Sequence, residues 1–293
     1  MLRKIRQKLL NPVLWKLDAQ EQILKTQVQL LDNITGLQEK NHEVVKSLDP
    51  KQKEEIDIYN FQDFKLLLEQ KGFVDNCMIT SGCYDSIHIE YFKKFWNYGG
   101  RKKKIFLDIG SYFGLYSLHA YKSNLFNEIY AFEADRYNYS QMQANLFINR
   151  IVNINAVNKA VSDKDGVICQ HPSMTVWGGV NRGGSFVGNP ENVEDEFDSI
   201  SVDCVALDSF FSPEIKDSVL ICKIDVERHE VYALNGMKNL IRNNKVIMQV
   251  EVFNMEQADN MESFMKENGL VKFHQIGDDF YITNVDDISN LKD

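Results

Sequence analysis

From residue 104 onward, short apolar runs alternate along the chain with longer amphipathic stretches. Apolar runs of roughly four to eight residues are typical of buried strands, and apolar positions three and four apart are typical of helices. These patterns predict strands over residues 105–108, 128–133, 151–157, 218–225, 246–252, 270–276 and 279–283, and helices over 113–122, 137–149, 231–242 and 256–268. The alternation predicts an α/β fold with a doubly wound, mostly parallel sheet and helices on both faces.

The end of the predicted sheet has a different connection. Gly277 and Asp278 separate the last two predicted strands, and a short Gly-Asp linker between two strands is a β-hairpin signal. We therefore expect one antiparallel strand near the C-terminus.

Before residue 101 the pattern is helical. Residues 14–48 have an imperfect heptad pattern, typical of a coiled coil, in which leucines recur every seven residues at Leu17, Leu24 and Leu31. Pro50, which has no amide hydrogen to donate, ends this helix. The chain is thus expected to have a helical extension at 1–48, a helical lead-in at 49–100 with helices near 56–71 and 84–98, and an α/β body at 101–293.

Two interpretations of the helical extension stay open. Residues 14–48 could pair in a homodimer or remain a single exposed helix. The basic residues Arg3, Lys4, Arg6 and Lys8 accompany apolar residues on one helical face. They could make a peripheral contact with an anionic membrane surface, or simply form a solvated helix end.

Composition narrows the class of protein. The net charge is -9, from 33 basic and 42 acidic residues, which argues against general nucleic-acid binding. No apolar run approaches the length of a membrane span or of a signal-peptide core. The 5 cysteines form no CxxC motif and are expected to be free thiols. Together these features favour a cytoplasmic protein, with the inner membrane surface as a second location.

The most informative motif follows the first strand of the predicted sheet. The strand leads directly into the loop that contains Asp108, Gly110, Ser111 and Gly114, and a helix follows. Ligands of doubly wound sheets bind at the carboxyl ends of the strands. Gly110 permits a sharp turn close to a ligand, and Gly114 lets the helix begin tightly against the strand. Glu133 ends the second strand, where an acid can bind both hydroxyls of a ribose.

The loop also indicates which nucleotide-like cofactor binds. Dinucleotide sites normally have a GxGxxG loop that faces a pyrophosphate, whereas this loop reads GSYFG after Asp108. A carboxylate there favours a cation over a phosphate. S-adenosylmethionine has a ribose, an ammonium and a sulfonium, so we expect Asp108 at its amino-acid end and Glu133 at its ribose. An ordinary strand–helix turn without a ligand is the alternative interpretation.

Four motifs in order along the chain resemble the FkbM-type S-adenosylmethionine-dependent methyltransferases. They are LDIGSYFG at 107–114, YAFEAD at 130–135, AVSDKDG at 160–166, and KIDVERHE at 223–230 with LNG at 234–236. Arg228 stands where the family has glycine. The resemblance implies a class I methyltransferase domain at 101–293 that methylates an oxygen, on a sugar of a surface glycan or on a secondary metabolite.

The fourth motif holds the candidate catalytic residues. Strand alternation places Lys223, Asp225 and Glu227 on one face. By the resemblance and by its position at a strand end, Asp225 is expected beside the methyl sulfonium, orienting the acceptor. His229 is a candidate general base because the pKa of histidine lies near neutrality, or else a solvated residue at a helix start.

Other polar residues are candidates for binding. Glu251 is expected to line the acceptor pocket with Glu227; a divalent cation bound by both and Asp225 is less favoured than ligand hydroxyls. Asp163 could reach the adenine amino group or lie in a solvated turn. Trp177 and Asn181, in a glycine-rich segment, would suit a sugar, although a loop packed on its own tryptophan explains them as well.

The resulting prediction is an S-adenosylmethionine-dependent O-methyltransferase. Two alternatives stay open. One is an NAD-dependent oxidoreductase with a Rossmann fold, which the missing GxGxxG loop argues against. The other is a non-catalytic, cofactor-binding assembly protein that uses its coiled-coil arm, since a fold alone does not establish activity.

Overall fold

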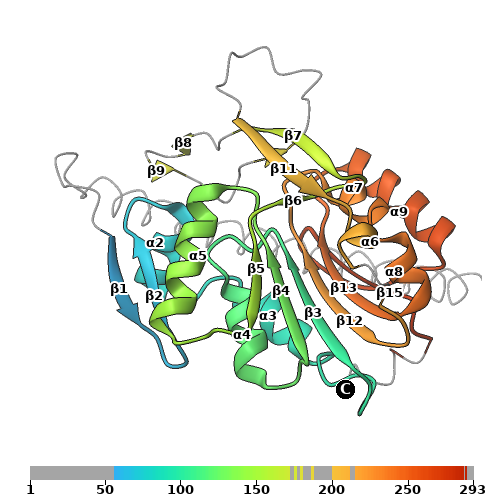
Figure 1. Ribbon diagram of the computed structural model, residues 1–293, viewed down its shortest axis with the longest axis horizontal. Coiled ribbons are helices and arrows are strands. Elements are labelled where there is room, and N and C mark those ends of the chain that lie inside the picture. Colours follow the sequence, from blue (N-terminus) through green and yellow to red (C-terminus); the bar gives the residue numbers. More distant parts are fainter. Residues whose placement is uncertain are drawn as a thin grey trace, which may run out of the picture. The chain divides into compact units, whose positions relative to one another are not determined.

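The computed structural model describes residues 56–171, 175–176, 179–180, 186–187, 200–211, 215–286 and 288 (Figure 1). The predicted helix at 14–48, the basic N-terminus, Trp177 and Asn181 lie outside these residues. No helix in the described part of the chain combines the length and apolar character needed to cross a membrane.

A seven-stranded sheet forms the centre of the fold. Its order is β14-β15-β13-β12-β3-β4-β5. The strands are β3 (Lys104–Ile109), β4 (Glu128–Phe132), β5 (Ile154–Val157), β12 (Val219–Ile224), β13 (Lys245–Glu251), β14 (Val271–Ile276) and β15 (Asp279–Thr283). All neighbours from β5 to β13 are parallel, and β15 runs antiparallel to both β13 and β14. The predicted doubly wound sheet with one antiparallel strand is confirmed.

The two faces of this sheet carry separate hydrophobic cores. Every residue of β3 and β12 is buried, as expected for parallel strands covered on both faces. Side chains of β3 alternate between the cores: Phe106 packs in one, Ile105 and Leu107 in the other.

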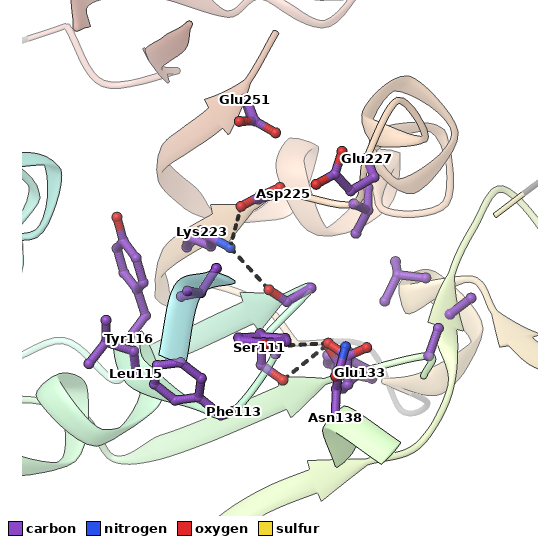
Figure 2. Close-up of a pocket in the computed structure, with 18 of the residues that line it drawn as sticks. Ser111, Phe113, Leu115, Tyr116, Glu133, Asn138, Lys223, Asp225, Glu227 and Glu251 are labelled. Atoms are coloured by element: carbon purple, nitrogen blue, oxygen red, sulfur yellow. Dashed lines mark hydrogen bonds and ion pairs between the residues drawn. The ribbon is translucent and has the colours of Figure 1, made fainter. Parts of the chain in front are cut away.

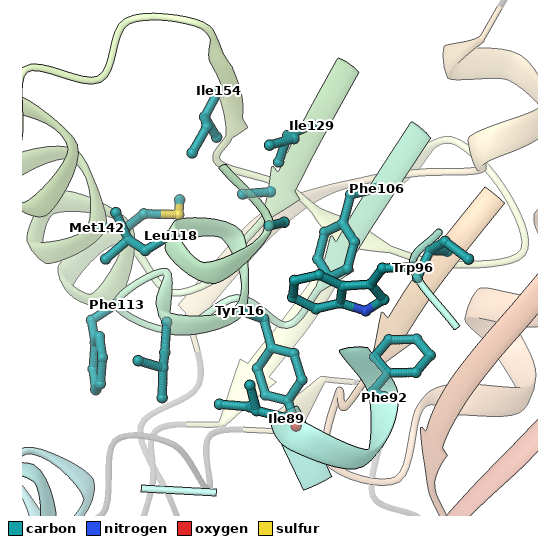
Figure 3. Close-up of a cluster of buried hydrophobic side chains, with 14 of the residues drawn as sticks. Ile89, Phe92, Trp96, Phe106, Phe113, Tyr116, Leu118, Ile129, Met142 and Ile154 are labelled. Carbon is teal, nitrogen blue, oxygen red and sulfur yellow. The ribbon is translucent and has the colours of Figure 1, made fainter. Parts of the chain in front are cut away.

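Helices cover each face of the sheet. The first core includes residues of α3 (Ser86–Lys93), α4 (Leu115–Ser123) and α5 (Arg136–Ile148), and the second those of α7 (Glu230–Asn235), α8 (Lys238–Asn243) and α9 (Met255–Asn268). In the first core Trp96 packs edge-on against Phe106, with ring centroids 5.3 Å apart (Figure 3).

The helix predicted at 56–71 is wrong. The segment is an antiparallel hairpin of β1 (Ile56–Asn60) and β2 (Lys65–Glu69), followed by α2 (Phe73–Ser81). Leu66 and Leu68 of β2 are fully buried. The backbone N–H groups of β2 find their hydrogen-bond partners in side-chain amides in and directly after α5. Leu67 N donates to Asn145 Oδ1 at 2.6 Å, and Lys65 N donates to Asn149 Oδ1 at 2.8 Å. The hydrogen-bond partners of this strand edge thus come from a helix far along the chain. No local pattern in the sequence indicates such a contact.

The helix predicted at 231–242 is interrupted at Gly236, which separates α7 from α8. A Cβ at Gly236 would lie 1.9 Å from the carbonyl oxygen of Ser162. Only glycine fits this approach of two backbone segments. The helix predicted at 84–98 is shorter, since α3 ends at Lys93.

A second sheet was not predicted. It has the order β10-β7-β11-β6, formed by β6 (Ala160–Val161), β7 (Gly166–His171), β10 (Phe186–Val187) and β11 (Ile200–Val205). Two short strands, β8 (Thr175–Val176) and β9 (Gly179–Val180), pair separately, and α6 (Leu207–Phe210) follows β11. All five cysteines are free thiols, as expected from the sequence.

Candidate active site

A cavity lies at the carboxyl ends of β3, β4 and β12 (Figure 2). Its lining includes the loop after β3, the end of β4, the start of the second sheet and the polar ends of β12 and β13. Asp225, Glu227 and Glu251 gather at one end, and Glu133 lies at the other (Figure 2). The structure thus brings both ends of the predicted site into one cavity.

The loop after β3 passes directly against the end of β12. Gly110 has φ +78°, and a Cβ there would lie 1.7 Å from the carbonyl oxygen of Asp225. Gly110 N and Ser111 N both donate to Phe132 O, at 3.0 Å each. Gly110 is therefore required by the close approach of the two backbones, and it and Ser111 line the cavity.

Asp108 lies beneath this loop and does not line the cavity. Its Oδ2 accepts hydrogen bonds from Ser117 N at 2.9 Å and Ser117 Oγ at 2.6 Å, in the first turn of α4. Burial raises the pKa of Asp108 to about 6, although Lys223 opposes the shift. Gly114, also predicted to bind the cofactor, caps α4 at φ +89° and packs against Met142. Asp108 and Gly114 therefore support the loop after β3 but do not line the cavity.

Glu133 lines the cavity, and a backbone N–H group holds each of its carboxylate oxygens. Oε2 accepts from Tyr112 N at 2.7 Å, and Oε1 accepts from Asp135 N at 2.9 Å. Burial raises the pKa of Glu133 to about 7, and the two backbone donors limit that rise. Each carboxylate oxygen has a second acceptor position, so a fixed Glu133 can still accept from two ligand hydroxyls.

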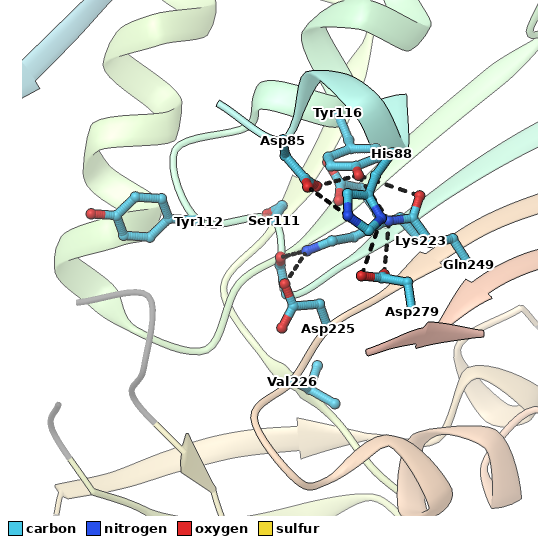
Figure 4. A network of polar contacts seen from close by, with 12 residues as sticks. Asp85, His88, Ser111, Tyr112, Tyr116, Lys223, Asp225, Val226, Gln249 and Asp279 are labelled. Atoms are coloured by element: carbon cyan, nitrogen blue, oxygen red, sulfur yellow. Dashed lines mark hydrogen bonds and ion pairs between the residues drawn. The ribbon is translucent and has the colours of Figure 1, made fainter. Parts of the chain in front are cut away.

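A buried ion pair organises the opposite end. Lys223 Nζ lies 2.9 Å from Asp225 Oδ2 and donates to Gly110 O at 3.0 Å (Figure 4). Burial opposes the charge on Lys223, but Asp225 and Asp108 outweigh it and raise the lysine pKa. Burial likewise opposes the charge on Asp225, and Lys223 outweighs it, so the pKa of Asp225 is lowered. Both residues are ionised at neutral pH.

Two further carboxyl groups surround Asp225. Carboxylate oxygens of Asp225, Glu227 and Glu251 lie within 4.8 Å of one another. Burial, the charge of Asp225 and a hydrogen bond to it raise the pKa of Glu251 to about 10. Burial and the charges of Asp225 and Glu230 raise the pKa of Glu227 to about 7. At neutral pH this group therefore holds an ionised Asp225 and a protonated Glu251.

The turn that carries Glu227 is backbone-strained. Glu227 has φ +53° and Arg228 φ +75°, in the left-handed region that favours glycine. The buried carboxylate of Glu230 stabilises the turn, because its Oε1 accepts from Val226 N at 3.2 Å and Arg228 N at 3.1 Å. Glycine adopts this conformation without strain, which agrees with the glycine that the FkbM-type pattern has at position 228.

Two further predicted site residues, like Asp108 and Gly114, do not line the cavity. His229 is 6% exposed, with Nε2 2.9 Å from Ser162 Oγ and its ring stacked on Tyr232, and burial lowers its pKa to about 4. Asp163 is exposed and accepts from Ser162 Oγ at 3.2 Å. Neither lines the cavity, so the general-base assignment of His229 has no geometric support.

A polar network behind Lys223 was missed by the sequence analysis. Tyr116 OH donates to Asp85, and Gln249 Nε2 donates to Tyr116 OH and to Asp279 Oδ1, at 2.9 Å each (Figure 4). His88 Nδ1 lies 3.2 Å from Asp279 Oδ2. Tyr116 and Asp85 line the cavity. Their contacts join α3, α4, β13 and β15, which lie far apart in the sequence.

Comparison with known proteins identifies the family. Residues 108–271 match the model of the methyltransferase FkbM domain. The chain belongs to this family. The seven-stranded order with one antiparallel strand is the class I methyltransferase fold. Membership makes S-adenosylmethionine the cofactor of this domain and removes the NAD-dependent oxidoreductase from consideration.

Two solved structures with a similar arrangement are distant from this chain in sequence. The FkbM methyltransferase of Methylobacillus flagellatus KT is 16% identical, with a TM-score of 0.41, over 72% of this chain and 52% of that one. This chain therefore spans about half the length of that protein. A methyltransferase of Agrobacterium tumefaciens is 9% identical, with a TM-score of 0.44, over 80% and 71% of the two chains. No curated protein sequence matches the chain.

The cavity residues fit S-adenosylmethionine, which supplies a methyl group on a positively charged sulfur. Glu133 offers two fixed acceptors to a ribose, and the ionised Asp225 suits a cationic group. Gly110 and Ser111 line the cavity from the loop after β3, the first with no side chain and the second with a short one. Asp225 would lie at the cationic end and Glu133 at the ribose.

We expect Glu133→Gln to weaken binding of S-adenosylhomocysteine by about 10- to 100-fold, because a glutamine places an NH₂ group against a backbone N–H donor and loses one acceptor. Isothermal titration calorimetry measures the effect. Glu128→Gln, at the partly exposed start of the same strand, is the matched control and should bind like the wild type. Equal affinity of the two variants would remove Glu133 from the cofactor site.

Proposed function

We propose that this protein transfers a methyl group from S-adenosylmethionine to a hydroxyl oxygen of a sugar, in a surface glycan or a glycosylated secondary metabolite. The observation that carries the proposal is the group formed by Asp225, Glu227 and Glu251 at one end of the cofactor cavity. At neutral pH Asp225 is ionised, Glu227 is close to its pKa and Glu251 is protonated. The group therefore offers both hydrogen-bond acceptors and a donor to the hydroxyl groups of an acceptor.

A second cavity supports an acceptor rich in hydroxyl groups. It shares Glu251 with the cofactor cavity, and its lining includes the polar residues Arg228, Glu230, Tyr232, Asn235, Gln257 and Asn260. The Tyr232 side chain is 53% exposed, and one ring face stacks on buried His229 at 4.6 Å. A fixed, exposed aromatic ring beside amide groups is suited to the CH face and hydroxyls of a sugar.

Glu227 is the general base in this proposal. It lines the cavity next to Asp225, and its pKa of about 7 is matched to proton transfer near neutral pH. It would accept the proton of the acceptor hydroxyl while Asp225, held by Lys223, orients that hydroxyl. The same three carboxylates could instead hold a divalent cation, which the proposal does not require.

The acceptor class is tested with S-adenosylmethionine that carries a deuterated methyl group. The purified protein is incubated with it and with glycan and small-molecule fractions from cells that lack the protein. We expect label in methyl ethers of sugar residues, identified by mass spectrometry. Label on nitrogen or carbon alone would contradict the O-methyl proposal. Tight S-adenosylhomocysteine binding without any transfer would favour the non-catalytic assembly protein.

Glu227→Gln is expected to lower the transfer rate by about 10²- to 10⁴-fold while S-adenosylhomocysteine binds as before. A base must be ionised, so the wild-type rate should fall as pH drops below about 7, the pKa of Glu227, and level off above it. The variant should lose this dependence. Glu256→Gln, exposed on α9, is the control. A wild-type pH profile retained in Glu227→Gln would exclude this base.

The N-terminal residues carry separate proposals. Pairing through residues 14–48 would make a homodimer, and the basic start would place a cytoplasmic protein at the inner membrane surface. Deletion of residues 1–48 is expected to halve the mass in solution, measured by light scattering, and to abolish sedimentation with phosphatidylserine vesicles. An unchanged mass would contradict the dimer, and unchanged sedimentation would contradict the membrane contact.

A further inference from the structure

Arg228 keeps a long side chain at a position where the backbone favours none. Its φ is +75°, in the left-handed region that glycine adopts without strain. The FkbM-type pattern has glycine here, so this chain carries a charged side chain that the pattern lacks. Residues held in such a conformation gather at functional sites. The Arg228 side chain is therefore a candidate for binding a ligand.

Arg228 lines the second cavity, which shares Glu251 with the cofactor cavity. Its guanidinium carbon lies 5.5 Å from the centre of the Phe253 ring, a cation–π contact that supports the charged group. Arg228 and Phe253 belong to the connections that follow the neighbouring strands β12 and β13. The cation thus lies at the edge of the sheet where ligands of this fold bind, one position along the chain from Glu227.

The acidic residues of the second cavity do not pair with this arginine. Glu230 Oε1 accepts from two backbone N–H groups, and its Oε2 accepts from Gln257 Nε2 at 3.3 Å. Glu251 is hydrogen-bonded to Asp225 and is protonated at neutral pH, because its pKa is raised to about 10. Within the described part of the chain, the Arg228 guanidinium has neither an ion pair nor a hydrogen bond. Its N–H donors are available to a ligand.

The chemistry of the lining selects the kind of ligand. A guanidinium presents a planar fork of donors that binds two oxygens of a carboxylate or a phosphate at once. The lining also offers neutral amides, from Asn235, Gln257 and Asn260, and the half-exposed ring of Tyr232. A sugar with an acidic group would use both parts, with its hydroxyls on the amides and its oxyanion on Arg228. A cationic acceptor would be repelled.

We propose that the methyl acceptor is an acidic sugar and that Arg228 binds its carboxylate or phosphate group in the second cavity. The inference rests on the proposed transfer to a sugar hydroxyl and narrows the acceptor to one charge class. It also gives a reason for the strained arginine, because glycine at this position would leave the cavity without a cation among its described lining residues.

The test repeats the transfer of deuterated methyl groups with fractions that anion-exchange chromatography has separated into neutral and acidic pools. We expect the wild type to label the acidic pool. Arg228→Gly, which relieves the backbone strain, should label that pool about 10- to 100-fold more slowly, because the contact with the oxyanion is lost. The variant should bind S-adenosylhomocysteine like the wild type in calorimetry, since Arg228 does not line the cofactor cavity.

Arg150→Gly is the matched control. Arg150 is exposed, has φ +57° and lines neither cavity, so this variant loses the same charge and the same kind of strain away from the site. It should label the acidic pool at the wild-type rate. Salt gives a second measurement, because dissolved ions screen an exposed ion pair. Wild-type labelling of the acidic pool should slow as potassium chloride is added, and Arg228→Gly should respond less.

Two treatments of the acidic pool identify the anion. Loss of labelling after phosphatase would assign a phosphate, and loss after reduction of carboxylates to alcohols would assign a carboxylate. Labelling that survives both treatments, or that is confined to the neutral pool, would overturn the proposal whether or not Arg228→Gly folds. Labelling of the acidic pool by Arg228→Gly at the wild-type rate would also overturn it. If the wild type binds S-adenosylhomocysteine but labels neither pool, the proposed function itself fails.

Discussion

The ion pair between Lys223 and Asp225 determines the chemistry of the site. Lys223 is buried at the end of β12, and its ammonium group contacts both Asp225 and the carbonyl of Gly110. A buried cation is tolerated only when opposite charges and acceptors surround it. The pair keeps Asp225 ionised, and the negative charge of Asp225 in turn helps to raise the pKa of Glu251 and Glu227. Lys223 thus keeps one carboxyl group ionised, and the charge of that group adds to the effect of burial in raising the pKa of the other two.

Sequence patterns predicted those parts of the fold that depend on local periodicity. The apolar runs of β3 and β12 indicated fully buried parallel strands, and Gly277-Asp278 indicated the antiparallel pair. Glu133 was found because its place at a strand end follows from the topology alone. The hairpin at 56–69 was mistaken for a helix because Phe61, Phe64 and Leu68, three and four residues apart, also fit a helical spacing, and its partners come from α5.

The site residues that the sequence analysis missed or misplaced depend on contacts between distant segments. His229 looked like a base because the pKa of histidine lies near neutrality, but the fold buries it outside the cavity, hydrogen-bonded to Ser162, 67 positions earlier. Gln170, which lines the cavity, carried no signal, since its burial and its hydrogen bond to Asp135 come from contacts between segments far apart in the sequence. The role of these polar side chains depends on whether they are buried. Burial depends on contacts across the whole fold, which a local sequence pattern does not contain.

Helix α7 is held at both ends by one short loop. At its start His229 bonds to the side chain of Ser162, and after its end Gly236 abuts the backbone of the same serine. Val161, next to this serine, lines the cofactor cavity, while Tyr232 of α7 lines the second cavity. Ser162 therefore links the wall of the cofactor cavity to the helix that lines the second cavity. A substitution that displaces α7 would act on both cavities through this one serine.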